Sequence, residues 1–212
     1  MPHSRYIPGT SFFLCLIAIV SLCIGKYVQA AEPVWSLYEL RQRNVVLQQW
    51  DLSCAAAALA TILRYQHGEP VTERYVALGL INRREYISNP EFVRIRQGFS
   101  LLDLKRFVEK IGYQGSGFGQ MALADLCQKA PIIVPVNLQG FAHFVVFRGL
   151  ARNTVLVADP AFGNLTMSQE KFLHGWIKYK DIGRVGFTVT KPGPQIIPNK
   201  LTPHDSDFIM LR

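Results

Sequence analysis

The sequence has no run of like charge, no closely spaced pair of metal ligands and no nucleotide-binding motif. Its 23 lysines and arginines outnumber its 15 aspartates and glutamates, but the excess is spread along the chain. The clusters Arg83-Arg84 and Arg94 with Arg96 are typical of a solvated helix face, so we expect no nucleic-acid partner. Without a short-spaced histidine or cysteine pair we expect no metal site. The motif Gly-x4-Gly-Lys-Ser/Thr is absent, which argues against ATP, and no other cofactor is expected.

The longest apolar run is short for a membrane anchor. It extends over residues 11–25, which is 15 residues, whereas a spanning helix needs about 20. Basic residues His3 and Arg5 precede it, and Val28-Gln29-Ala30 follows it with the small-x-small pattern of a signal-peptidase site. We therefore predict that residues 1–30 are a signal peptide cleaved near Ala30, and that the mature protein lies in the periplasm. An uncleaved inner-membrane anchor is the alternative.

After residue 30 the chain has predicted helices first and predicted strands later. Apolar spacing predicts helices at residues 54–65, 72–80, 100–111 and 121–128, and apolar or alternating runs predict strands at residues 132–136, 142–148, 154–158 and 184–190. This order indicates an α+β fold in two packed layers. We assign residues 31–190 to one domain and predict that the proline-rich residues 191–212 form an extended or disordered tail.

Three local features refine this pattern. Ser100 and Asp103 form a predicted capping box at the start of the third helix. Residues 34–47 are predicted to be a strand or an extended arm. The glycines of residues 115–119 resemble a phosphate loop in spacing only, and we predict a flexible turn there.

Cys54 begins the alanine-rich helix predicted over residues 54–65. A thiol at a helix N-terminus is biased toward thiolate, because unpaired N–H groups and the helix dipole favour negative charge there. Cys127, the other cysteine after residue 30, fits the apolar face of a short helix and is expected to be buried and inert. A disulfide between the two cysteines is the alternative, and it would abolish the nucleophile.

His143 and Asp159 lie on the two arms of the predicted hairpin. If its turn centres on Ala151, they stand directly opposite each other on one face, with Cβ atoms about 5 Å apart. The carboxylate would then orient the imidazole and stabilise its charged form, whereas a shift of one residue would separate the faces. Taken singly, the histidine is a core residue and the aspartate starts a turn before Pro160. Together with Cys54, the pair indicates a thiol-dependent hydrolase.

Gln48 lies six residues before Cys54. A loop of this length can fold back so that the side-chain amide donates to an oxyanion near the sulfur, with the Cys54 N–H as the second donor. The alternatives are an ordinary surface glutamine or the equally available neighbour Gln49. Trp50 is a candidate wall of the substrate cleft.

These residues form a pattern that resembles the C39 cysteine peptidases over about residues 45–190. The pattern consists of Gln48-x5-Cys54, Cys-x2-Ala-x-Leu-Ala-x-Ile-Leu-x-Tyr-x2-Gly from Cys54 to Gly68, His143-Phe-Val-Val, and Val155-x-Val-x-Asp159-Pro-Ala-x-Gly163. The resemblance implies a papain-like α+β fold, in which N-terminal helices, with the nucleophile at a helix N-terminus, pack on an antiparallel sheet.

The resemblance also implies roles for the four candidate residues. Cys54 is the nucleophile, His143 the general base and acid, Asp159 its orienting partner and Gln48 the oxyanion donor. The family usually has Asp-Cys-Gly at the nucleophile, whereas this chain has Ser53-Cys54-Ala55. We expect the Cβ of Ala55 to reshape the approach to the sulfur.

Members of this family cut leader peptides after a double glycine, usually as the first domain of an exporter. This chain has no exporter helices and resembles the stand-alone members that accompany functional-amyloid secretion in pseudomonads. The resemblance implies a cysteine endopeptidase whose substrate is an exported protein or peptide, cut at a glycine-containing site, with outer-membrane secretion machinery as a candidate partner. A catalytically silent module that binds an exported substrate, or a thiol amidase or acyltransferase, is the alternative.

Overall fold

The structure is a computed structural model, and it describes residues 35–82, 88, 89, 91, 98–138, 140–194 and 197–208. The predicted signal peptide and the basic clusters Arg83-Arg84 and Arg94 with Arg96 lie outside the described residues. The chain divides into two compact units, residues 1–35 and 36–212, and the fold described below belongs to the second. Among the described residues, none of the helices has both the length and the hydropathy that a membrane span requires.

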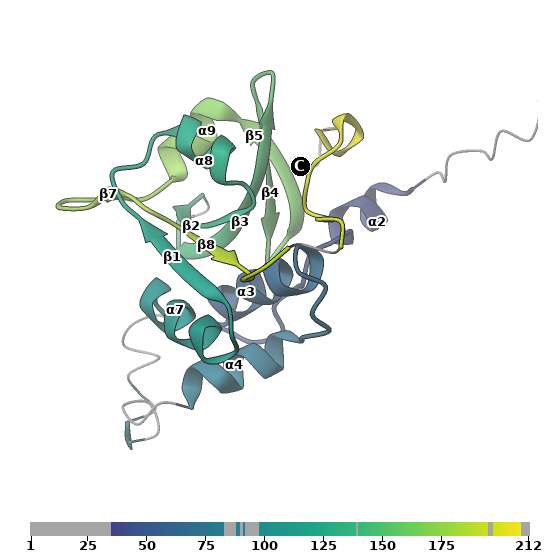
Figure 1. The fold of residues 1–212 in the computed structure, drawn as a ribbon. Helices are drawn as coiled ribbons and strands as arrows, with labels where there is room; N and C mark the ends of the chain where they lie inside the picture. The colour runs from purple at the N-terminus through teal and green to yellow at the C-terminus, as the bar shows by residue number, and fades with distance from the viewer. Residues whose placement is uncertain are drawn as a thin grey trace, which may run out of the picture. The chain divides into compact units, whose positions relative to one another are not determined.

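One six-stranded antiparallel sheet organises the second unit (Figure 1), with the strand order β1-β8-β2-β3-β4-β5. The helices are α2 (Leu37–Gln42), α3 (Cys54–Tyr65), α4 (Glu73–Ile81), α7 (Leu101–Lys110), α8 (Leu123–Lys129) and α9 (Gln169–Gly175). The strands are β1 (Gln114–Phe118), β2 (Ile132–Asn137), β3 (Ala142–Ala151), β4 (Thr154–Asp159), β5 (Gly163–Ser168), β6 (Lys178–Tyr179), β7 (Gly183–Arg184) and β8 (Gly186–Thr190). The predicted α+β class is confirmed.

Helix α3 packs between the sheet and the helices α4 and α7 (Figure 1). Every residue of α3 from Cys54 to Leu63 is buried. Because its alanines have small side chains, the helix axis can approach the sheet closely. Leu59 and Ile62 belong to the same hydrophobic cluster as Val146 and Ala158 of the sheet. Burial of each large aliphatic side chain there contributes about 1.5–3 kcal/mol, so this layer fixes the position of the helix.

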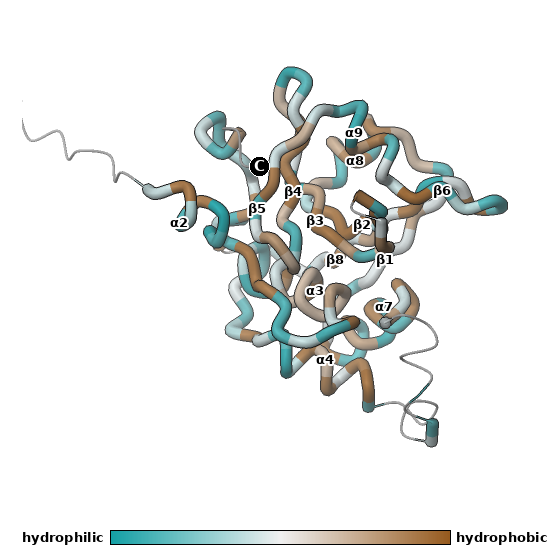
Figure 2. Tube along the Cα trace, turned by 180° about the vertical axis from the view of Figure 1, so that it is seen from behind, coloured by the Kyte–Doolittle hydropathy of each residue, from teal (hydrophilic) through white to brown (hydrophobic). Residues whose placement is uncertain are grey.

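A second hydrophobic cluster covers the other face of the sheet. Phe172 and Trp176, in and just after α9, pack there with Val145 and Phe147 of β3. Successive side chains of a strand point to opposite faces, so Val145 and Phe147 face α9 while Val146 faces α3. Figure 2 shows hydrophobic chain along β2 and β3 in the middle of the sheet. The core therefore has two layers, one on each side of the sheet.

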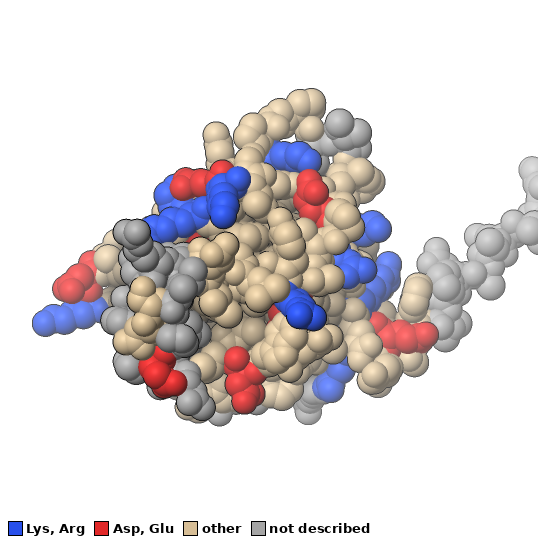
Figure 3. Space-filling model, turned by 90° about the horizontal axis from the view of Figure 1, so that it is seen from below, with Lys and Arg blue, Asp and Glu red and all other residues tan. Residues whose placement is uncertain are grey.

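Charged side chains are mixed in sign on the face shown in Figure 3, where lysines and arginines alternate with aspartates and glutamates. This agrees with the even spread of charge along the sequence.

Two helices were predicted accurately at their ends. Helix α3 begins and ends at the predicted residues, Cys54 and Tyr65. Helix α7 begins with the predicted capping box, in which Ser100 Oγ accepts from Asp103 N at 3.2 Å and Asp103 Oδ2 accepts from Ser100 N at 2.9 Å.

Two other predictions were wrong. Residues 37–42 are helical rather than extended, because Ser36 and Glu39 form a second capping box. Residues 114–118 are strand β1 rather than a flexible turn. A Cβ at Gly115 would lie 2.7 Å from Phe187 and 2.8 Å from Val108, so glycine serves close packing here and not flexibility.

The β3–β4 hairpin has a different turn from the one predicted. Ala151 pairs with Thr154, so the turn is the two residues Arg152-Asn153 rather than a loop centred on Ala151. A β-bulge between Phe147 and Gly149 then shifts the register by one residue. Beyond the bulge, Val146 pairs with Ala158. The next residue of β4, Asp159, therefore shares a face with His143, as alternate residues of β3 do.

The bulge decides this outcome. Without it, the two-residue turn would place Asp159 opposite Val146, on the face away from His143. One extra residue in β3, Arg148, reverses that. The prediction that His143 and Asp159 share a face is correct, although the predicted turn is not. The actual turn and the bulge together shift the predicted pairing by two residues, and a shift of two residues leaves each side chain on the same face.

The C-terminal segment packs on the domain instead of being disordered. Leu201 is fully buried, and Lys200 N donates to Tyr65 O at 2.8 Å. A 3-10 helix follows at Asp205–Phe208. The domain therefore includes residues 197–208, beyond the predicted boundary at 190, because a leucine among the prolines supplies an apolar anchor.

Arg148 connects this segment to the bulge. Its buried guanidinium donates to Leu201 O at 3.1 Å, Asn164 Oδ1 at 3.0 Å and Asp207 Oδ2 at 3.4 Å. Burial lowers the pKa of Arg148. A Cβ at Gly149 would lie 2.8 Å from Pro203 Cγ, so the segment lies directly on the bulge.

We predict that Arg148→Met lowers the free energy of unfolding by about 2–4 kcal/mol, because the buried acceptors of its three hydrogen bonds lose their donor. Urea denaturation measures the change. Arg106→Met, at an exposed position of α7, is the control and should change the free energy by less than about 0.5 kcal/mol. Equal stabilities of the two variants would contradict the prediction.

Candidate active site

Cys54 is the first residue of α3 and is a free thiol with 9% of its surface exposed. Cys127 is also free, so the structure does not contain the alternative disulfide. Cys127 is exposed on α8, contrary to the expectation of a buried thiol, because Leu126 occupies the buried face of that helix. The two sulfurs therefore differ in exposure, and the buried one is at the helix N-terminus.

Different neighbours of Cys54 shift the pKa of its thiol in opposite directions. Burial raises the pKa of the Cys54 thiol above its ordinary value. The backbone N–H groups of Phe144, Ala55 and Cys54 itself lower that pKa, and the charge of Asp159 raises it. The helix N-terminus thus acts as predicted, but burial outweighs it. A thiol whose pKa is raised in this way becomes a nucleophile more readily when a base can take its proton.

His143 and Asp159 are in direct contact, as their shared face predicts. His143 Nε2 lies 3.0 Å from Asp159 Oδ2, and both side chains are buried. The other carboxylate oxygen, Oδ1, accepts from Ala161 N at 2.8 Å and from Phe162 N at 3.3 Å. Asp159 therefore both starts the turn and holds the imidazole, so the two interpretations of this residue are compatible.

The turn that follows Asp159 depends on glycine. Asp159 pairs with Gly163, which has a φ of +82°. A Cβ at Gly163 would lie only 2.4 Å from Arg41 O. Glycine alone combines this left-handed conformation with such a close backbone approach.

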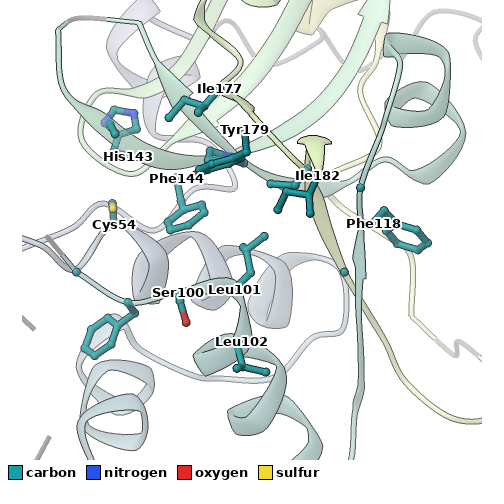
Figure 4. Close-up of a pocket in the computed structure, with 17 residues that line it drawn as sticks. Cys54, Ser100, Leu101, Leu102, Phe118, His143, Phe144, Ile177, Tyr179 and Ile182 are labelled. Carbon is teal, nitrogen blue, oxygen red and sulfur yellow. The ribbon is translucent and has the colours of Figure 1, made fainter. Parts of the chain in front are cut away.

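The second ring nitrogen of His143 is available for the thiol. Since a carboxylate only accepts, the contact with Asp159 places the ring hydrogen on Nε2 and leaves a lone pair on Nδ1. Nδ1 is buried and has no hydrogen-bond partner among the described residues. Figure 4 shows the sulfur of Cys54 pointing toward the side on which the ring of His143 lies. The arrangement suits transfer of the thiol proton to Nδ1.

Gln48 does not itself line the pocket that Cys54 and His143 line, but its loop contacts the turn after Asp159. Its backbone N donates to Pro160 O at 2.8 Å, which connects it to the turn after Asp159. Its side-chain Nε2 lies 3.4 Å from Trp50 O. Gln49 uses its backbone N–H on Glu73, and its side chain is exposed. The backbone thus places Gln48 beside the site, while its amide is held by the loop.

An apolar pocket with a volume of about 600 Å³ begins at Cys54 and His143 (Figure 4). Most of its walls are large apolar side chains from α7, β1, β3 and the β6–β7 region, namely Phe99, Leu101, Leu102, Phe118, Phe144, Ile177, Tyr179, Ile182 and Val185. Sequence reasoning missed this pocket, because only the folded sheet brings these segments together. Trp50, the predicted cleft wall, does not line it.

Ala55 does not line the pocket at the sulfur, whereas its Cβ was expected to reshape the approach there. It is fully buried and belongs to the hydrophobic cluster between α3 and the sheet. Its Cβ therefore contributes to the core.

Three further histidines lie among the described residues, apart from His143. His174 and His204 are exposed, but His67 is buried, with Nε2 3.0 Å from Val189 O and its ring against Tyr113. Burial lowers the pKa of His67. In the described ranges, no three histidine, cysteine or carboxylate side chains are grouped as a metal site would require.

Known proteins are similar to most of this chain. The model of the Peptidase C39 family matches residues 42–180. A probable functional amyloid protease FapD of Pseudomonas fluorescens is 40% identical over 173 residues, which cover 77% of this chain and 74% of that protein. The protein of the same description from Pseudomonas aeruginosa is 39% identical over 177 residues, covering 80% of this chain and 76% of its own.

Solved structures show the same fold. A double glycine motif protease from an AMS/PCAT transporter, in complex with the leader peptide, has a TM-score of 0.54 at 22% identity, covering 71% of this chain and 95% of its own. The peptidase domain of Streptococcus ComA also has a TM-score of 0.54, at 19% identity, and covers 69% of this chain and 97% of its own.

We predict that His143→Ala slows the alkylation of Cys54 by iodoacetamide roughly ten-fold or more at pH 7, because the thiol then keeps its proton. The pKa of the thiol is raised, so the thiolate forms only as the pH rises through that value. The difference in Cys54 alkylation rate between His143→Ala and wild type should therefore become smaller at high pH.

Mass spectrometry of the peptides that contain Cys54 and Cys127 measures both rates in one sample. The Cys127 rate should be the same in wild type and His143→Ala, which makes it the internal control. Equal rates of Cys54 alkylation in wild type and His143→Ala at pH 7 would show that the imidazole does not take the proton of this thiol.

Proposed function

Since the chain belongs to the peptidase C39 family and is a cysteine peptidase, we propose that it is a periplasmic endopeptidase that cuts an exported protein. The observation that carries this proposal is the 3.0 Å contact between His143 Nε2 and Asp159 Oδ2, which leaves Nδ1 without a hydrogen-bond partner among the described residues, in a pocket that Cys54 also lines. A base oriented in this way is what a buried, protonated thiol requires.

In the proposed reaction, Nδ1 of His143 takes the proton of Cys54 as the sulfur attacks the peptide carbonyl carbon. The carbonyl oxygen becomes an oxyanion, and its donors are the Cys54 N–H at the start of α3 and the side-chain amide of Gln48. His143 then gives the proton to the leaving amine, which breaks the peptide bond and leaves a thioester. A water molecule, deprotonated by His143, hydrolyses the thioester and frees the sulfur. Asp159 keeps the ring oriented throughout.

Two considerations support the nature of the substrate. The FapD relatives, at 39–40% identity, are described as probable functional amyloid proteases, which favours an exported amyloid protein. The apolar pocket beside Cys54 suits apolar side chains next to the cut bond, and one solved structure of the same fold is described as a double glycine motif protease. We therefore propose a glycine-containing cleavage site.

The N-terminal pattern supports the location. Residues 1–30 combine a basic start, an apolar run and a small-x-small site, so we propose export and cleavage near Ala30. An enzyme in the periplasm would meet its substrate before that substrate reaches the outer-membrane secretion machinery, which is the proposed partner.

We predict that native cells carrying Cys54→Ala accumulate one exported protein in a longer, uncut form, because no other group replaces the sulfur nucleophile. Mass spectrometry of exported proteins identifies this precursor, and the N-terminus of the wild-type product identifies the cut bond. Cys127→Ser, which changes the exposed thiol on α8, is the matched control and should leave processing unchanged. If no exported protein changes in size, the proposed function is wrong.

A further inference from the structure

We propose that Glu73 is a positioning residue, which fixes the loop between Gln48 and Cys54 so that both oxyanion donors are in place. Glu73 is the first residue of α4 and only 4% of its surface is exposed. Its two carboxylate oxygens each lie 3.0 Å from Gln49 N, and one of them also contacts Ser53 Oγ. The carboxylate therefore holds both ends of the loop. This inference rests on the proposed function of the same site.

The contacts of Glu73 continue to the Gln48 amide. Ser53 Oγ lies 2.6 Å from Trp50 O, and Gln48 Nε2 lies 3.4 Å from the same oxygen. A side-chain amide has two N–H donors, so Trp50 O can hold one while the other is directed at an oxyanion. Ser53 Oγ has one hydrogen, which it donates to either Trp50 O or the Glu73 carboxylate, so the environment of the carbonyl that holds this amide is coupled to the Glu73–Ser53 contact.

The loop needs such support for a conformational reason. Leu52 has a φ of +66°, a left-handed conformation that costs a residue with a side chain about 1–3 kcal/mol. Surrounding contacts must compensate for this cost, and those of Glu73 are available on both sides of Leu52. A displacement of about 1 Å of either donor would reduce transition-state stabilisation strongly.

Capping of α4 does not account for the burial of this carboxylate. Thr72 fills the N-cap position, and its Oγ1 accepts from Tyr75 N at 3.2 Å. The carboxylate of Glu73 instead contacts Gln49 and Ser53 of the loop. Since a buried carboxylate is costly unless it is hydrogen-bonded, its place here indicates a function in holding the loop.

Two reagents separate this role from a merely structural one. Iodoacetamide alkylates the thiolate without forming an oxyanion. A peptide aldehyde ending in glycinal adds reversibly to Cys54: the S–C bond forms, the C=O π electrons move to oxygen, and the thiol proton goes to His143 or to that oxygen. Only the second reaction uses the oxyanion donors. Protection of Cys54 from iodoacetamide by the aldehyde measures aldehyde affinity in the intact protein.

We predict that Glu73→Gln weakens aldehyde binding about 10–100-fold, while the alkylation rate without aldehyde stays within about two-fold of wild type. The amide keeps the size of the carboxylate but cannot accept from Gln49 N through both terminal atoms. Glu69→Gln is the matched control: its carboxylate contacts Tyr113 and Lys191 after the other end of α3, so both measurements should be unchanged.

Two results would overturn the inference. Equal aldehyde affinities in Glu73→Gln and wild type would show that the carboxylate does not position the donors. A joint loss of aldehyde binding, alkylation and melting temperature would show a structural role only. If Glu73→Gln does not fold, Ser53→Ala decides by the same criteria, because it removes the hydroxyl between Glu73 and Trp50 O. None of these results depends on a natural substrate, so they are independent of the Cys54→Ala experiment.

Discussion

The contact between His143 and Asp159 depends on which face of the sheet each side chain occupies. A two-residue turn alone would put them on opposite faces, and the bulge at Arg148 brings them to the same one. The contact between His143 and Asp159 is thus a property of strand register rather than of the two residues. The turn after Asp159 is held by the other oxygen of the same carboxylate, Oδ1, which accepts from Ala161 N.

Helix α3 and the sheet divide the chemistry between two rigid elements. The helix supplies the sulfur and its own N–H groups, and the sheet supplies the base, so packing of the alanine-rich helix sets the distance between them. The loop between Gln48 and Cys54 contacts both the sheet and a helix. It is joined to the sheet through Gln48 N and Pro160 O, and to α4 through Glu73. Burial of Cys54 makes this arrangement necessary, because a thiol with a raised pKa depends on its base.

Much of the fold could be predicted, because local patterns determine it: the ends of α3 follow from its alanines and Gly68, and α7 from its capping box. Cys54, His143 and Asp159 could be proposed together because one starts the predicted helix and the other two face each other in the predicted hairpin. The bulge could not be predicted, since Arg148 reads as an ordinary strand residue until its partners Leu201 and Asp207 are known. The apolar pocket and the role of Glu73 were missed for the same reason: their contacts join distant segments.

The last described residues of the chain lie against the bulge that sets the register of the catalytic strands. Leu201 is buried there and accepts from Arg148. The same guanidinium also donates to Asp207 Oδ2, in the 3-10 helix at Asp205–Phe208. A polypeptide that ends before residue 201 therefore lacks the two contacts by which Arg148 joins this segment to the bulge.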